Sequence, residues 1–190
     1  VGTQIAAKGH NFPKLTLVGV VDADLGLKGG DLRAGERTYQ TLVQVAGRAG
    51  RADRPGRALL QTHEPEHEAI QALLAGDRDS FLDLEALMRE QLGLPPFGRL
   101  AALVMSGTDE RLLAETAKIA AAAAPLSDDV KLFGPAEPPL AVVRGRYRRR
   151  FLVQAQRNVD VSAFMATWMA RFKLPSSIRA RVDIEPYSFL

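Results

Sequence analysis

Two consecutive prolines, in the segment Gly93-Leu94-Pro95-Pro96, constrain the fold of this chain more than any other feature. Proline has a fixed φ and no amide hydrogen, so it ends a helix, and two in succession stiffen the link that follows. A chain of 190 residues is long enough to bury a core in one large domain or in two small ones. We therefore expect two domains, one over residues 1–93 and the other over residues 97–190.

The first half alternates strand and helix patterns. A continuous apolar, β-branched run over residues 15–21 is typical of a buried parallel strand. A second short strand is predicted over residues 58–62, and helices are predicted over residues 33–51, 65–74 and 77–92. This alternating order indicates an α/β domain in which helices flank a parallel sheet.

The second half follows a different order. Its patterns predict strand, helix, three strands, helix and strand, over residues 99–106, 109–123, 130–134, 140–144, 150–156, 160–172 and 180–184. That order approximates a β-α-β-β-α-β split sandwich with an added hairpin around Gly145. The helix over 160–172 has one apolar stripe, which predicts that it packs across the sheet with Trp168 in the core.

Charge is distributed unevenly along the chain. The net charge is +3, but residues 1–96 carry 11 basic and 13 acidic side chains, whereas residues 97–190 carry 14 and 9. The excess of basic residues is concentrated around a predicted turn at Gly145, where one tyrosine lies among five arginines: Arg144, Arg146, Tyr147, Arg148, Arg149 and Arg150. Such a cluster is typical of a site for phosphate backbones, and a tyrosine there can stack on an exposed base. The alternative is a solvated, charged sheet edge, which prevents aggregation.

A second arginine pair lies in the first half, in Gln44-Val45-Ala46-Gly47-Arg48-Ala49-Gly50-Arg51. In a helix, residues three apart share a face, so Arg48 and Arg51 are predicted to point the same way. The guanidinium group is a planar, charged fork that matches phosphate oxygens, which favours a nucleotide site. The alternative is two surface arginines on an ordinary helix.

These segments resemble a known family. Gln44 to Arg51 is similar to the last motif of superfamily 2 helicases, Q-x-x-G-R-x-G-R, and residues 2–13 are similar to the preceding motif in one branch. That branch is the primosomal protein N′ (PriA) family of replication-restart helicases. The resemblance extends over nearly the whole chain, through residues 21–24, 60–67, 94–97, 134–136 and 183–186.

The resemblance implies roles for individual residues. Arg51 would be the arginine finger that reaches the γ-phosphate, with Arg48 beside it and Gln44 bonding near the same site. A second group would couple the nucleotide to the DNA backbone: Gly2, Thr3, Gln4, Lys8 and Gly9. This group is not a phosphate-binding P-loop, because Ala7 and Gly9 occupy the positions where that pattern needs glycine and Ser or Thr.

The resemblance also implies an architecture and an activity. The expected fold is α/β, the closing part of a RecA-like helicase lobe 2 followed by a small α+β domain that contacts DNA. The parent would be a cytoplasmic ATP hydrolase that translocates 3′→5′ on DNA and restarts stalled forks by primosome assembly. Its expected partners are forked or single-stranded DNA, single-strand-binding protein and primosome proteins, with no membrane.

Because the chain opens inside a motif and without methionine, we expect a fragment. The P-loop and the acidic Mg²⁺ motif are missing, so the fragment alone is expected to be inactive. ATP, Mg²⁺ and zinc would be bound by the parent only, since no cysteine occurs here. Two alternatives remain: a non-catalytic nucleic-acid-binding module, and a module that docks a primosome partner.

No metal site is expected in this chain. Asp22 and Asp24 follow the first strand, and we interpret them as interface contacts or loop caps. His63-Glu64-Pro65-Glu66-His67 matches the zinc-protease string H-E-x-x-H, but that motif needs one continuous helix, and Pro65 falls in its middle.

Overall fold

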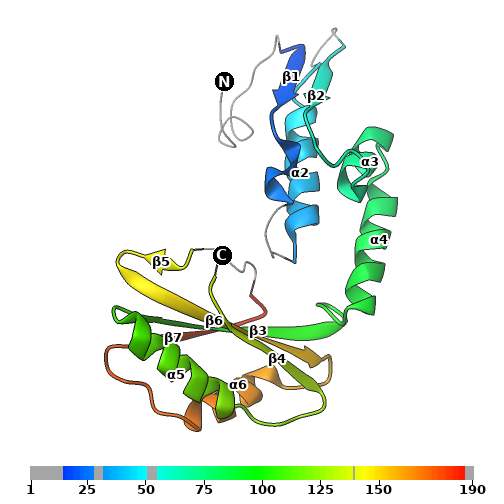
Figure 1. Cartoon of the computed structure of the whole chain (residues 1–190). Coiled ribbons are helices and arrows are strands. Elements are labelled where there is room, and N and C mark those ends of the chain that lie inside the picture. Colours follow the sequence, from blue (N-terminus) through cyan, green and yellow to red (C-terminus); the bar gives the residue numbers. More distant parts are fainter. Residues whose placement is uncertain (1–14, 28–31, 51–54, 139, 187–190) are drawn as a thin grey trace. The chain divides into compact units, whose positions relative to one another are not determined.

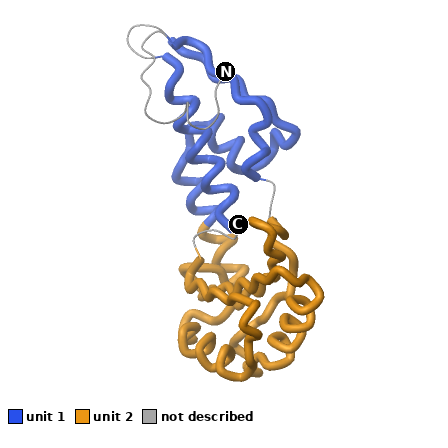
Figure 2. Tube along the Cα trace, turned by 90° about the vertical axis from the view of Figure 1, so that its left-hand side faces the viewer, with its two compact units in different colours: residues 1–85 blue, residues 86–190 orange. Residues whose placement is uncertain are grey.

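The computed structural model describes residues 15–27, 32–50, 55–138 and 140–186, and the statements below concern these residues. The chain divides into two compact units, Val1–Glu85 and Ala86–Leu190, which Figure 2 shows in different colours. Each unit is described by itself. The two functional domains expected on either side of Gly93–Pro96 stay a prediction.

Unit 1 is built around one pair of parallel strands. β1 (Leu17–Val20) lies beside β2 (Arg57–Leu60), and the 3₁₀ helix η1 (Ala23–Gly26) follows β1 directly. The connecting helix α2 (Ala34–Ala46) packs on α3 (Glu68–Ala75) through two small apolar clusters, and in one of them the rings of Tyr39 and Phe81 stack with centroids 4.6 Å apart. The predicted α/β order with a parallel pair is therefore confirmed (Figure 1). The assignment to a RecA-like lobe stays an expectation.

Helix α2 ends at Ala46, five residues before the predicted end at Arg51. The amide of Gly47 still bonds the carbonyl of Val43 at 2.9 Å, but those of Arg48 and Ala49 bond carbonyls three residues back, as in a tightening last turn. Gly50 then takes a φ of 74°, which glycine adopts without a steric penalty, and the chain leaves the helix.

Helix α3 begins at Glu68, and not at Pro65 as predicted. His67 is its N-cap, because the imidazole Nδ1 accepts a hydrogen bond from the amide of Ala69 at 3.2 Å. Helix α4 (Arg78–Gln91) follows, and Asp77 accepts the amide of Ser80 at 3.0 Å. The segment from His63 to His67 therefore does not form the single helix that the zinc-protease string requires.

Unit 2 contains one antiparallel sheet and two helices. β3 (Gly98–Gly107), α5 (Glu110–Ala122) and β4 (Val130–Ala136) are followed by the hairpin of β5 (Val142–Val143) and β6 (Arg146–Gln156). The chain continues through α6 (Val161–Ala170) into β7 (Arg179–Ile184). The strand order is β4-β6-β3-β7, with β5 beside β6. The predicted β-α-β-β-α-β arrangement with an added hairpin is confirmed, and Figure 1 shows α5 and α6 on one face of the sheet.

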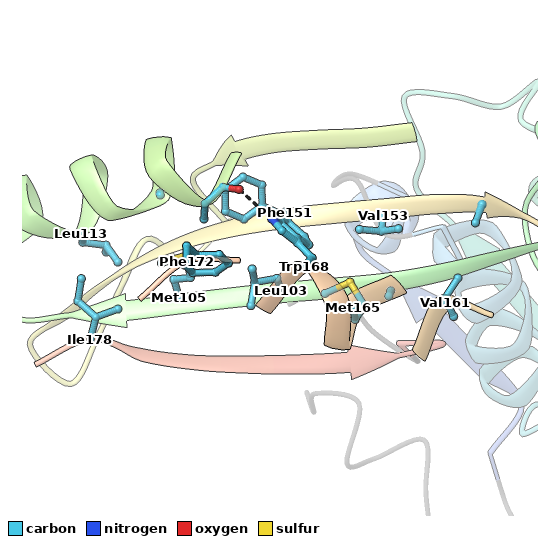
Figure 3. Packing of buried hydrophobic residues seen from close by; sticks show 14 residues of the cluster. Leu103, Met105, Leu113, Phe151, Val153, Val161, Met165, Trp168, Phe172 and Ile178 are labelled. Atoms are coloured by element: carbon cyan, nitrogen blue, oxygen red, sulfur yellow. Dashed lines mark hydrogen bonds between the residues drawn. The ribbon is translucent and has the colours of Figure 1, made fainter. Parts of the chain in front are cut away.

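The core of unit 2 lies between that sheet and the two helices (Figure 3). Trp168 on α6 is fully buried, as predicted, and its indole Nε1–H donates to the carbonyl of Ala120 at 2.8 Å. Its ring meets that of Phe151 edge to face, with centroids 5.2 Å apart. Side chains alternate along a strand, so the residues on either side of Phe151 in β6 lie on the opposite face of the sheet.

No helix within the described ranges combines the length and apolar character needed to cross a bilayer.

Candidate nucleotide and nucleic-acid sites

Only part of the predicted nucleotide site lies in the described residues. Gln44 is exposed on α2, and Arg48 is half-buried in the turn that follows it. Arg51 and the predicted coupling group, which is Gly2, Thr3, Gln4, Lys8 and Gly9, lie outside the described residues. The argument that Arg48 is displayed on a helical face was wrong, because α2 ends two residues earlier. The roles of these residues stay predictions.

The turn that carries Arg48 is attached to the start of the parallel strand pair. The amide of Gly50 donates to the carbonyl of Leu15 at 3.0 Å, two residues before β1 begins. This hydrogen bond therefore holds the turn that carries Arg48 close to the start of β1.

Asp24 joins the carboxyl ends of β1 and β2. It is fully buried, and its carboxylate accepts hydrogen bonds from the hydroxyl of Thr62 and from the amide of His63, the latter at 2.6 Å. The amide of Ala23 also donates to the carbonyl of Gln61 at 2.8 Å. These bonds fit the interpretation of Asp24 as a loop cap, because both carboxylate oxygens accept hydrogen bonds from the loop that follows β2.

In unit 2, the arginine-rich segment begins at a two-residue hairpin turn. Arg144 and Gly145 both have positive φ, 50° and 72°, and they connect β5 to β6. Paired positive φ values are typical of the turns that match strand twist in hairpins. The predicted turn at Gly145 is confirmed, and it leaves Arg144 exposed at the tip.

The five arginines do not form one cluster, because Arg144 lies in the turn and β6 distributes the other four over both faces of the sheet. Phe151 and Val153 lie in the core, so Tyr147 and Arg149 are on that same face, where Tyr147 packs against the core. Arg146, Arg148 and Arg150 lie on the opposite face. The expectation that the hairpin tip displays all of these arginines together was therefore wrong, although the residues are neighbours in sequence.

Arg149 and Arg146 contact neighbouring elements of the protein. The Nη2 atom of Arg149 lies 3.2 Å from a carboxylate oxygen of Glu110 and 3.1 Å from one of Glu137, and the side chain is only 14% exposed. The Nη2 atom of Arg146 donates to the carbonyls of Ser106 at 2.8 Å and Ser177 at 3.1 Å. These side chains hold the hairpin to neighbouring elements.

Arg148 and Arg150, both half-buried, lie two residues apart on this opposite face of β6. Burial lowers the pKa of Arg150, and the charge of Arg148 lowers it further, although a guanidinium keeps its proton in proteins.

Two more arginines on this face were not singled out in the sequence. Arg179 and Arg181 lie on β7, in positions that pair with Ser106 and Val104 of β3. Their alternation with Ala180 and Val182 was visible, but only the strand order places them near β6.

The family model described as "Primosomal protein N C-terminal domain" matches residues 90–187, which is more than half of the chain. The chain belongs to the primosomal protein N (PriA) family. The predicted membership of the PriA family is thereby confirmed.

PriA relatives match the chain over its whole length. The Replication restart protein PriA of Rickettsia conorii is 42% identical over 189 residues, covering 100% of this chain and 29% of the relative. Those of Treponema pallidum and Bacillus subtilis are 38% and 34% identical, with 100% of this chain covered and 29% and 24% of the relatives. The chain therefore spans less than a third of the length of these PriA proteins.

Proposed function

We propose that this chain is part of an ATP-dependent 3′→5′ DNA helicase that restarts stalled replication forks. The observation that carries the proposal is the similarity to proteins named replication restart protein PriA, which extends over the whole chain at 34% to 42% identity. Those names support a role in replication restart. The helicase activity is the finer part of the proposal and belongs to the parent protein, which would bind ATP and Mg²⁺.

In this proposal, unit 1 senses the nucleotide. Arg51, assisted by Arg48 and Gln44, would place positive charge against the terminal phosphate, where negative charge develops during phosphoryl transfer. The anchoring of Gly50 to Leu15 supports it, because a fixed backbone positions a charge better than a free loop. The group Gly2, Thr3, Gln4, Lys8 and Gly9 would pass the nucleotide state to DNA.

A matched pair of arginine variants in the full-length parent tests this role. Arg51→Ala should lower DNA-stimulated ATP hydrolysis about 10³-fold or more, because removal of an arginine finger has effects of that size. Arg78→Ala is the control, since its side chain is 71% exposed on α4. Its ATPase rate should stay within about twofold of the parent. Unchanged turnover of Arg51→Ala would reject the motor interpretation.

In the same proposal, unit 2 contacts DNA. Arg144, Arg148 and Arg150 would bind phosphates, while Arg146 and Arg149 would position the hairpin through the bonds described above. The rival interpretation, a DNA-binding module without ATP chemistry, is favoured by the basic face alone. Arg51→Ala separates the two, because the rival expects no link between that residue and any turnover. Single-strand-binding protein and primosome proteins stay the expected partners.

A further inference from the structure

Two large apolar side chains are exposed at the end of α5. Ile119 is 58% exposed, and Leu126, which lies in the loop between α5 and β4, is fully exposed. Ala122 is also exposed, and because it follows Ile119 by three residues it lies on the same side of the helix. A single exposed leucine is common on soluble proteins, so the meaning of this group depends on how it is held and on what surrounds it.

The loop that carries Leu126 is held at both ends. At its start the amide of Ala124 donates to the carbonyl of Ala121 at 3.2 Å, and Ala124 packs against the core of unit 2. At its end the carbonyl of Asp129 accepts the amide of Gln156 at 3.0 Å. Leu126 is therefore displayed on an ordered loop, from which transfer of its side chain out of water would be favourable.

The exposed side of α6 has an unusual composition. The ten residues of this helix include no charged side chain. Val161, Met165 and Trp168 are buried and account for one side of the helix. The other side of a surface helix usually carries charged residues, and a helix without them is normally buried all round. The positions exposed in this chain carry small side chains instead: Ser162, Ala163, Ala166, Thr167 and Ala170.

The end of α5 and the helix α6 are neighbours in unit 2. The indole of Trp168 on α6 donates to the carbonyl of Ala120 at 2.8 Å, and both helices lie on one side of the sheet (Figure 1). The beginning of α5 differs, because Arg111 and Glu115 form an exposed ion pair there at 3.2 Å. We name the uncharged surface the helix-side patch, and it consists of Ile119, Ala122, Leu126, Ala163, Ala166 and Ala170.

The charges around the helix-side patch do not fit a nucleic acid. Binding of a phosphate backbone requires several lysines or arginines, and the patch contains neither. Asp128 and Asp129 are exposed in the same loop as Leu126, so they would repel phosphates. The surface that complements this patch is therefore apolar, with neutral or basic residues opposite the two aspartates.

The size of the patch favours a covering surface within the same polypeptide. Stable contacts between separate proteins use about 20–30 residues on each side, which is several times the size of this patch. A contact within one polypeptide needs less area, because the tether gives an effective concentration on the order of millimolar. The chain corresponds to 29% of the PriA of Rickettsia conorii and 24% of that of Bacillus subtilis, so most of such a protein lies outside it.

We propose that the helix-side patch packs against an apolar surface in the part of the PriA parent that lies outside these 190 residues. The end of α5 and the exposed side of α6 are then a buried domain contact in the parent, and Leu126 is its anchor. The proposal requires neither ATP hydrolysis nor DNA binding, so it can fail while the proposed function stands, and the reverse also holds.

Thiol labelling at position 126 tests the proposal, because the 190-residue chain has no cysteine. Leu126→Cys is made in this chain and in the full-length parent, and the rate of reaction with a maleimide fluorophore is measured in each. The parent without the substitution gives the background from its own cysteines. The rate should be at least about tenfold lower in the parent, because the thiol is covered there. Arg111→Cys is the matched control, since Arg111 is 91% exposed at the beginning of α5, and its two rates should agree within about twofold.

A charged substitution on α6 gives an independent measurement. Ala166→Glu should lower the thermal midpoint of the parent by about 4 °C or more, because the new carboxylate would be buried in the contact. The midpoint of the 190-residue chain, in which Ala166 is exposed, should move by less than about 2 °C. Equal shifts in both proteins would contradict the proposal.

The labelling rates also separate the other possible occupants of the patch. Equal rates of Leu126→Cys in the chain and in the parent would overturn the proposal, because the patch would then be open to solvent or to a separate protein. Protection in the parent that fades on dilution would overturn it as well, and would assign the patch to a contact between two copies. Protection that is independent of concentration supports the contact within one polypeptide.

Discussion

Arg146 should stabilise unit 2, whereas its neighbour Arg148 should not. The guanidinium of Arg146 donates to the carbonyls of Ser106 and Ser177, which lie on β3 and just before β7. A hydrogen bond from a charged donor contributes about 1.5–3 kcal/mol when partly buried and less when exposed. Arg146→Ala should therefore lower the free energy of unfolding by about 2 kcal/mol.

Urea unfolding followed by the emission of Trp168 measures this effect, because the single tryptophan lies in the core of unit 2. For a unit of this size, an m-value of about 1.3 kcal/mol per M places the midpoint about 1.5 M lower. Arg148→Ala is the matched control. The hydrogen bond from its Nη1 atom to the carbonyl of Leu140 is long, at 3.4 Å, so the midpoint of this variant should move by less than about 0.4 M. Equal midpoints for the two variants would refute the positioning role of Arg146.

Three further outcomes can be measured. Gly145→Ala should cost about 1 kcal/mol in urea unfolding, because φ is 72° while no atom lies near the added Cβ; an unchanged midpoint would contradict it. Trp168→Phe should lower the free energy of unfolding by about 2–3 kcal/mol, since it removes the hydrogen bond to the carbonyl of Ala120 and leaves a void; far-UV circular dichroism measures the unfolding. The bonds of Ser80 lower the pKa of Asp77 below 3.8, so its stabilising effect is present above that pH and is lost as the pH falls through the lowered pKa. Asp77→Asn should flatten this acid loss of stability between about pH 5 and pH 2.

Local periodicity of apolar residues was sufficient to predict most of the helices and strands. The apolar stripe over residues 160–172 predicted a helix that buries Trp168, and α6 does so. The order of elements along unit 2 was also predicted, because it approximates a β-α-β-β-α-β pattern with an added hairpin. Boundaries were less accurate where glycine follows a helical pattern, as after Ala46.

The candidate nucleic-acid surface was harder to predict, because it depends on pairing between distant strands. The count of arginines from Arg144 to Arg150 was plain in the sequence, but the face on which each lies depends on the register that puts Phe151 in the core. The arginines of β7 join the surface only because β3 lies between β6 and β7. No local pattern carries that information.

The position of β3 has a consequence for how unit 2 is made. β3 is the first strand of its sheet to leave the ribosome, yet it pairs with β7, the last of the described strands, so that Leu103 lies opposite Val182. Contacts between residues this distant in sequence form late and slow folding. During synthesis one edge of β3 therefore stays unpaired until almost the whole unit has emerged, and a nascent chain paused before β7 would depend on chaperones to keep that edge from pairing with another polypeptide.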